Sequence, residues 1–171
     1  MNQTKGLFVI ALALFSLVGC ATGNLDGEPY WESISEHLRL AERYQRKKQY
    51  SLARTSYLHH IQARLSVKDK PEWENPHFYY LLIGDLFLSE ADIPEALKSY
   101  DMARKNGVDI GLVSDRYRLV ANSLAKNGDF DGAIEILNTY HDYDPLLFDM
   151  MRDRLAREKV ESEEAQMHGA Q

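Results

Sequence analysis

The sequence predicts an all-α protein, built as a stack of three helix hairpins closed by a capping helix. From Tyr30 onward, apolar residues recur with helical spacing and almost none of the alternation that is typical of strands. Turn-forming residues interrupt this pattern at intervals, and small residues recur within it at Ala53, Ala96 and Ala133. This internal repetition predicts hairpins that pack on one another, because a single hairpin leaves an apolar face exposed.

The composition predicts one folded domain. The chain has 171 residues, of which 44% are hydrophobic and 27% are charged, and this length supports one core rather than two. The formal net charge of −6 does not fit the basic surface that nucleic-acid binding requires, so no nucleic-acid partner is expected. The single cysteine, Cys20, excludes a disulfide within the chain.

The first twenty residues carry an export signal. Lys5 lies in a short polar start, and residues 6–16 form an uncharged apolar run that is too short for a permanent membrane-spanning helix. The sequence LVGC at residues 17–20 follows and resembles the bacterial lipobox. The resemblance implies cleavage after residue 19 and a diacylglycerol group on the Cys20 thiol, with acyl chains that anchor the protein in a membrane.

The residues after the cysteine suggest where the anchored domain lies. Ala21 occupies the position where an aspartate would indicate inner-membrane retention, so the resemblance favours an outer-membrane lipoprotein whose domain faces the periplasm. Residues 20–29 contain glycines and a proline and are expected to form a flexible tether. The alternatives are a plain signal peptide and an uncleaved anchor, with Cys20 incidental. The covalent lipid is the only bound group expected, and no cofactor is predicted.

Three windows behind the tether match one small-residue and aromatic pattern. They contain Leu40-Ala41-x-x-Tyr44 with Ala53-x-x-x-Tyr57, Tyr80-x-x-Ile83-Gly84-x-x-Phe87 with Ala96-x-x-x-Tyr100, and Tyr117-x-x-Val120-Ala121-x-x-Leu124 with Ala133-x-x-x-Leu137. This pattern resembles the tetratricopeptide repeat (TPR), which implies a right-handed superhelical stack. Small residues on the first helix of each repeat (helix A) face small residues on the second (helix B), so the helix axes can approach closely.

The repeat pattern assigns boundaries along the chain. We expect a TPR domain over residues 30–157, with repeats at about 34–65, 77–108 and 114–145. The alanines are spaced more widely than in an ideal repeat of about 34 residues, which places insertions at 66–75 and around 107–111. A capping helix is expected at 146–157, and residues 158–171 are expected to fray as an acidic tail.

The TPR resemblance also implies a binding surface, because helix A positions line the concave face in that family. Carried over by register, these positions are Leu38, Glu42, Gln45 and Arg46, then Leu81, Asp85, Leu88 and Ser89, then Arg118, Asn122, Ala125 and Lys126. Polar flanks around an apolar middle would suit an envelope protein or peptide segment. The alternative for the basic group in the third repeat is an ordinary solvated face. Trp73, in the long insertion, is a candidate exposed loop anchor, and the alternative is that it packs against helix B.

Catalytic and metal-binding motifs are not evident in the sequence. His59 and His60 are adjacent on one helix and point in different directions, so they cannot together ligate one metal ion. No phosphate loop, nucleophile elbow or HExxH motif occurs. We therefore expect a binding module rather than an enzyme, with no metal site.

Two functions follow as hypotheses from the predicted architecture and the predicted location at the outer membrane. The first is a membrane-anchored scaffold that assists the assembly of a pilus or secretion complex, which resembles the TPR lipoproteins of tight-adherence pili and the secretin pilotins. The second is an adaptor that recruits peptidoglycan hydrolases or other cell-wall enzymes. The chaperone-tail TPR domains use a basic residue and an asparagine where this chain has Leu38 and Glu42, so that ligand is not expected.

Overall fold

A computed structural model of the chain describes the backbone of residues 28–169 and side chains from 36 to 168. The described part contains seven α-helices and no strand. Its elements are α1 (Glu28–Arg46), α2 (Tyr50–Leu65), the 3-10 helix η1 (Pro76–Phe78), α3 (Tyr79–Ser89), α4 (Ile93–Lys105), α5 (Ile110–Lys126), α6 (Phe130–Thr139), the 3-10 helix η2 (His141–Tyr143) and α7 (Pro145–Gly169).

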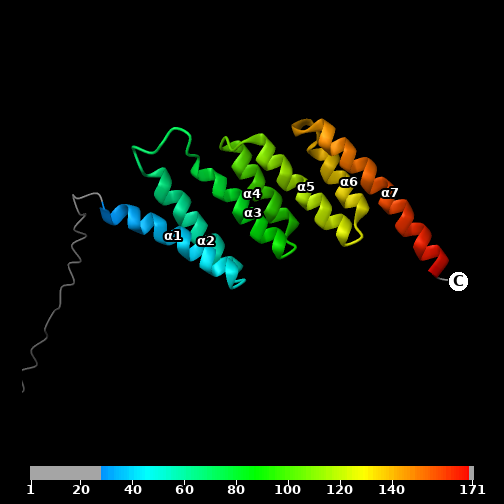
Figure 1. Cartoon of the computed structure of the whole chain (residues 1–171), viewed down its shortest axis with the longest axis horizontal. Helices are drawn as coiled ribbons and strands as arrows, with labels where there is room; N and C mark the ends of the chain where they lie inside the picture. The colour runs from blue at the N-terminus through cyan, green and yellow to red at the C-terminus, as the bar shows by residue number, and fades with distance from the viewer. Residues whose placement is uncertain (1–27, 170–171) are drawn as a thin grey trace, which may run out of the picture.

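The helices form a stack of antiparallel hairpins. Figure 1 shows them side by side in chain order, from α1 at one end to α7 at the other. The most extensive helix contacts are those of α1 with α2, α3 with α4, and α5 with α6. Contacts of α2 with α3, α4 with α5 and α6 with α7 join each hairpin to the next. The predicted all-α stack of three hairpins and a further helix is therefore confirmed.

The turn inside each hairpin has the same geometry in all three repeats. Lys48, Ala91 and Gly128 have φ values of 56°, 60° and 84°. In each turn the residue that follows donates its backbone N–H to a carbonyl in the last turn of helix A. That following residue also precedes helix B, and in the second and third repeats it is an aspartate that caps the helix by accepting from a backbone N–H. The left-handed position is costly for lysine and alanine but not for glycine.

Small side chains lie where the two helices of a hairpin meet. Ala41 and Ala53 in the first repeat are fully buried, as are Ala121 and Ala133 in the third. In the second repeat, Gly84 is buried on α3, and a Cβ atom there would lie within 2.8 Å of three atoms of the Tyr100 ring. The pattern that resembles TPR therefore corresponds to real close packing in this chain.

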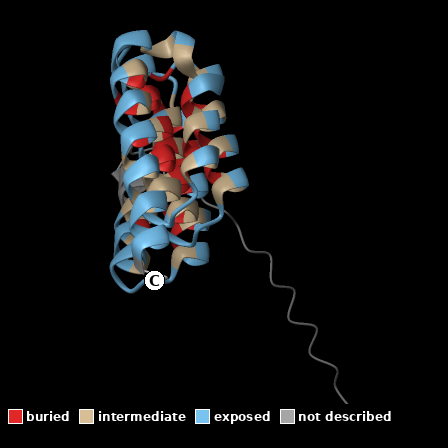
Figure 2. Cartoon of the chain, turned by 90° about the vertical axis from the view of Figure 1, so that its right-hand side faces the viewer, coloured by how far each residue is buried: buried red, intermediate tan, exposed pale blue. Residues whose placement is uncertain are grey.

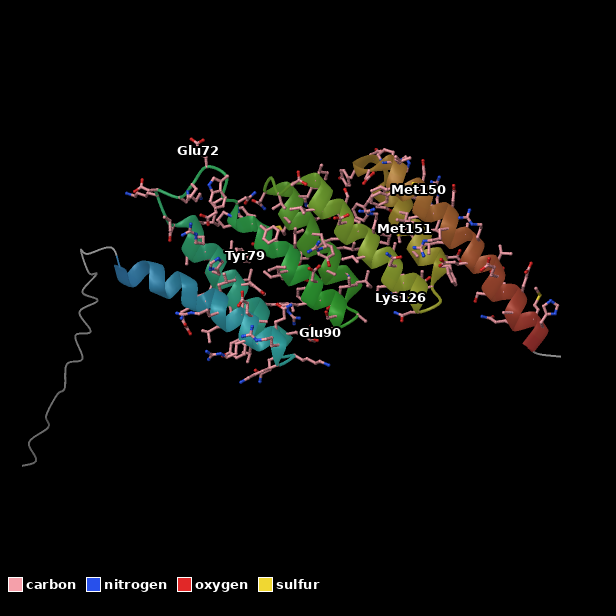
Figure 3. The ribbon with its side chains drawn as sticks, viewed as in Figure 1. Glu72, Tyr79, Glu90, Lys126, Met150 and Met151 are labelled. Carbon is pink, nitrogen blue, oxygen red and sulfur yellow. The ribbon has the colours of Figure 1, made fainter. Side chains whose placement is uncertain are left out.

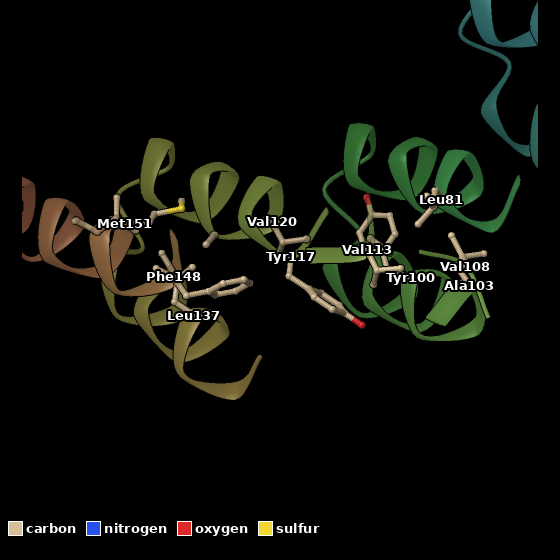
Figure 4. Close-up of a cluster of buried hydrophobic side chains, with 14 residues drawn as sticks. Leu81, Tyr100, Ala103, Val108, Val113, Tyr117, Val120, Leu137, Phe148 and Met151 are labelled. Atoms are coloured by element: carbon tan, nitrogen blue, oxygen red, sulfur yellow. The ribbon is translucent and has the colours of Figure 1, made fainter. Parts of the chain in front are cut away.

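Aromatic and aliphatic side chains fill the space between hairpins. The buried residues lie between two layers of helices (Figure 2), and they form two clusters. The larger cluster joins the second and third hairpins to α7, and Figure 4 shows Tyr100, Tyr117 and Phe148 within it. Tyr117 stacks on Tyr140 with ring centroids 3.6 Å apart and an interplanar angle of 6°. These contacts make one continuous support for the exposed face of the stack.

Several helix ends differ from the sequence-based expectations. Helix α1 begins at Glu28, inside the predicted tether, and α5 begins at Ile110 rather than near residue 114. Residues 66–75 lie between α2 and η1, as the repeat spacing indicated. The predicted signal peptide, Cys20 and residues 21–27 of the predicted tether lie outside the described residues.

The prediction that residues 158–171 fray is wrong as far as Gly169. Helix α7 continues through residues 158–169 without interruption. Arg154 donates to Glu158 at 2.8 Å one turn along the helix, and Lys159 pairs with Asp131 of α6 at 2.6 Å. Such pairs stabilise the last turns of α7, where no side chain of residues 158–168 is buried, and the sequence pattern of apolar spacing cannot detect them.

Candidate docking groove

The exposed face of the helix A series carries two adjoining hollows. One lies between α3 and α5 with a volume of about 290 Å³, and the other between α5 and α7 with about 310 Å³. Both are lined in part by Leu119 and Asn122. We call the two hollows together the helix A groove. Each hollow has the size of one or two side chains, which is at the lower limit for small-molecule pockets.

The hollow between α3 and α5 combines apolar and polar side chains. Its lining consists of Asp85, Leu88, Ser89, Leu119, Asn122, Ser123 and Lys126. Leu119 is 46% exposed, although Val120 and Ala121 beside it are fully buried. An exposed leucine between polar neighbours gives this hollow an apolar centre that water covers in the free protein.

The hollow between α5 and α7 is bordered by charged groups. Its lining consists of Asp115, Arg116, Arg118, Leu119, Asn122 and Met151. Arg118 pairs with Asp115 on its own helix, and its buried Nε atom has no hydrogen-bond partner among the described residues. Arg154 of α7 donates to the Asn122 side chain at 2.8 Å. Arg118 therefore retains a donor for which the described part of the chain supplies no acceptor.

Asp85 is held at the floor of the groove by two neighbours. Tyr100 donates its hydroxyl to Asp85 Oδ1 at 3.0 Å, and Arg116 Nε donates to the same oxygen at 3.0 Å. Burial raises the pKa of Tyr100 well above its ordinary value, and the nearby Asp85 carboxylate adds to this effect. The hydroxyl therefore remains protonated and keeps donating. This network connects α3, α4 and α5, so the groove has a rigid floor.

The structure brings together most of the predicted groove residues of the second and third repeats. Asp85, Leu88, Ser89, Asn122 and Lys126 line one hollow, and Arg118 lines the other; Figure 3 shows Lys126 near the end of α5. Ala125 is half-buried and packs against the larger core cluster. Sequence register missed Leu119, Arg116 and Met151. The exposure of Leu119 could not be inferred from an apolar residue next to the buried Val120 and Ala121.

One predicted groove residue is placed wrongly by the register. Leu81 is fully buried in the larger core cluster with Tyr100 and Val113. Val113 belongs to the extra first turn of α5, which begins before the predicted start of the third repeat. The extra turn adds apolar surface that a repeat of standard length would lack, and Leu81 therefore serves packing rather than binding.

The predicted groove residues of the first repeat lie apart from the two hollows. Glu42, Gln45 and Arg46 are exposed on α1, and Gln45 accepts a hydrogen bond of 2.9 Å from the Tyr57 hydroxyl. Leu38 is half-buried and packs against the smaller core cluster. The first repeat therefore adds only a polar flank to the exposed face of the stack.

The described part of the chain has neither a metal-binding cluster nor a membrane-spanning helix. Among residues 28–169, no group of three histidine, cysteine or acidic side chains is arranged to hold a metal ion. None of the described helices has the length and apolar content that a bilayer crossing requires. His60 is buried, and its ring lies edge-on to Tyr79 with centroids 4.5 Å apart, so it is part of the packing.

Comparisons with known proteins return a structural likeness. The chain is similar to a solved TPR structure. That structure is described as "TPR2B-domain:pHsp70-complex of yeast Sti1", and the match covers 74% of this chain and 98% of that one, with 14% sequence identity and a TM-score of 0.46. No family model and no curated protein sequence matches the chain. The fold assignment rests on the chain's own paired helices and on the buried repeat residues described above.

Proposed function

We propose that the protein is a membrane-anchored scaffold of the bacterial envelope that binds a partner protein in the helix A groove. The observation that carries this proposal is the exposed Leu119 between two hollows, on a floor fixed by the Asp85 network. An apolar centre with charged borders suits a partner segment that presents one or two apolar side chains among polar ones. Rigid helices on either side reduce the entropy that binding would otherwise cost.

The lipid anchor is the second part of the proposal and derives from the LVGC sequence at residues 17–20. An acylated Cys20 would hold the groove near the outer membrane, facing the periplasm. Confinement raises the effective concentration of the scaffold toward partners in the same membrane. The function that we propose is therefore to assist the assembly of a pilus or secretion complex.

Site-specific crosslinking tests the groove. A photoreactive amino acid placed at Leu119 should label a partner in intact cells. The same amino acid at Met102, which is 38% exposed on α4 outside the groove, provides a matched control. Substitution of Leu119 by lysine should reduce partner capture about ten-fold or more. Equal labelling from the two positions would contradict a groove-based mechanism.

The identity of the captured partner distinguishes the assembly hypothesis from the cell-wall adaptor hypothesis. Secretin or pilin components would support the assembly role, whereas peptidoglycan hydrolases would support the cell-wall adaptor. A Cys20→Ser variant tests the anchor, since it should lose acyl labelling and leave the outer-membrane fraction. A wild-type protein without acyl label would refute the anchor while leaving the groove proposal intact.

A further inference from the structure

A further hollow in the described part of the chain lies away from the helix A groove. It has a volume of about 710 Å³ and lies between residues 73–79 and the turn from α4 to α5. No residue lines both this hollow and the helix A groove. We call it the loop cleft. It is built by the insertion between the first two repeats, which the TPR pattern itself does not require.

The loop that forms one wall is fixed to the stack. Glu74 pairs with the buried Arg64 of α2. The Asn75 side chain donates to the backbone carbonyl of Asn106 at 2.9 Å and so joins the loop to the opposite wall. The Arg64 partner also lowers the pKa of Glu74, which keeps the carboxylate charged near neutral pH. The cleft is therefore preformed, and a ligand would not have to order it.

Aromatic side chains dominate the same wall. Trp73 is 84% exposed and Phe78 is 38% exposed. Tyr79 is held by stacking on Tyr57, with ring centroids 5.8 Å apart. Val108 and Leu112 add aliphatic surface from the other side. A large exposed indole beside a fixed apolar wall is typical of an interface anchor, and Figure 3 shows this loop standing out from the stack at Glu72.

The charges that line the cleft have one sign. Its acidic lining residues are Glu74 and Asp109, and no lysine or arginine of residues 28–169 lines it. Glu74 already has Arg64 as a partner, whereas Asp109 is exposed at the first turn of α5 and accepts from the Leu112 backbone N–H. Lys68 and Lys70 lie earlier in the loop and do not line the cleft. A ligand with a basic side chain would therefore complement Asp109.

We propose that the loop cleft binds an extended, proline-containing peptide that carries a basic residue. A polyproline II segment has no internal hydrogen bonds, so its carbonyl groups can accept from side-chain donors. The indole N–H of Trp73 and the hydroxyl of Tyr79 are donors on the aromatic wall. Aromatic-lined grooves recognise such segments because proline rings pack flat on aromatic rings and because little chain entropy is lost. This surface would bind a second partner segment, in addition to the one that we propose for the helix A groove.

Fluorescence anisotropy of a labelled peptide tests the proposal with the full mature protein. The probe is a fluorescein-labelled peptide of prolines and leucines with an arginine at each end. Trp73→Ala should weaken binding by at least about ten-fold. Asp109→Asn keeps a good helix cap and should weaken binding by a few-fold, with a smaller salt dependence. Leu119→Ala, in the helix A groove, should leave the affinity unchanged.

Three results would overturn the proposal. One is no binding of the proline peptide at millimolar protein, and another is unchanged affinity in Trp73→Ala. The third is tighter binding of a proline-free, helix-forming peptide of equal charge, which would identify a helical ligand instead. Because Trp73 is so exposed, its substitution should leave the helical circular dichroism spectrum intact. Crosslinking from Leu119 is independent of these results, so the two surfaces can fail separately.

Discussion

Substitution of Gly84 by alanine tests whether close packing within a hairpin holds the second repeat together. An added Cβ would lie within 2.8 Å of three atoms of the Tyr100 ring, whereas carbon atoms pack at about 3.5–4.0 Å. The ring would have to move by roughly 1 Å. It is fully buried, and its hydroxyl is bonded to Asp85, so it has little freedom to move.

Two opposing terms decide the sign of the effect. Alanine is favoured over glycine in a helix interior by about 1 kcal/mol. Overpacking of a well-filled core costs about 1–3 kcal/mol, and loss of the Tyr100 hydrogen bond to a charged acceptor would add about 1.5–3 kcal/mol. With the helix-propensity gain subtracted, we expect Gly84→Ala to lower the free energy of unfolding by about 1.5–5 kcal/mol if the hydrogen bond is lost, and by up to about 2 kcal/mol if it is kept. The measurement is urea denaturation followed by circular dichroism.

Two controls distinguish packing from helix propensity. Gly111→Ala adds the same methyl group at an exposed position of α5, where the nearest atom is a side-chain oxygen of Asp109 at 3.1 Å, and should change stability by less than about 1 kcal/mol. In a Tyr100→Leu background the cost of Gly84→Ala should shrink, since neighbouring substitutions are not additive. Stabilisation by Gly84→Ala, or strict additivity of the pair, would refute the reasoning.

Three further predictions concern the turns and the buried titratable groups. Ala91→Gly should raise the free energy of unfolding by about 1 kcal/mol because glycine tolerates the left-handed backbone of this turn better than alanine does. Gly128→Ala should lower the free energy of unfolding by a similar amount, and changes of the same sign in urea denaturation would contradict this. Burial lowers the pKa of His77, so the stability that its neutral form contributes is fully present above about pH 6.5 and is lost as pH falls through the lower folded-state pKa. His77→Gln should reduce this pH dependence in thermal unfolding, and an unchanged pH dependence would contradict the prediction. Burial raises the pKa of Tyr57 to about 12, so the stability contributed by its neutral hydroxyl is present below about pH 10 and is lost as pH rises through about 12. Phenolate absorbance should therefore show tyrosines that ionise only when the protein unfolds, and complete ionisation near pH 10 in the folded protein would be inconsistent with this burial.

Residue pattern alone predicted the helix pairs and the small residues at their contacts. Ala41, Gly84 and Ala121 were identified as the points of close approach, and each is buried. This succeeds because packing between adjacent helices is a local constraint that recurs in every repeat. The pattern was less successful at the helix ends, because α5 begins earlier and α7 ends later than the repeat pattern predicted.

The site residues were only partly predictable for the same reason. Asp85, Asn122 and Lys126 follow the helix A register and line the groove. Leu81 follows the same register but is buried, because the extra turn of α5 brings Val113 into its cluster. Leu119 was missed because its exposure depends on how α3, α5 and α7 diverge, which no single helix encodes.

The sequence by itself determined the fold class, the number of hairpins and the insertion after the first repeat. These properties depend on short-range spacing and on side-chain size, which are readable residue by residue. Only the tertiary structure decided which helix A side chains remain accessible, and that the insertion is fastened across to Asn106 to form a cleft. Those properties depend on the distance between elements far apart in the chain, and that distance is set by the packing of the whole stack.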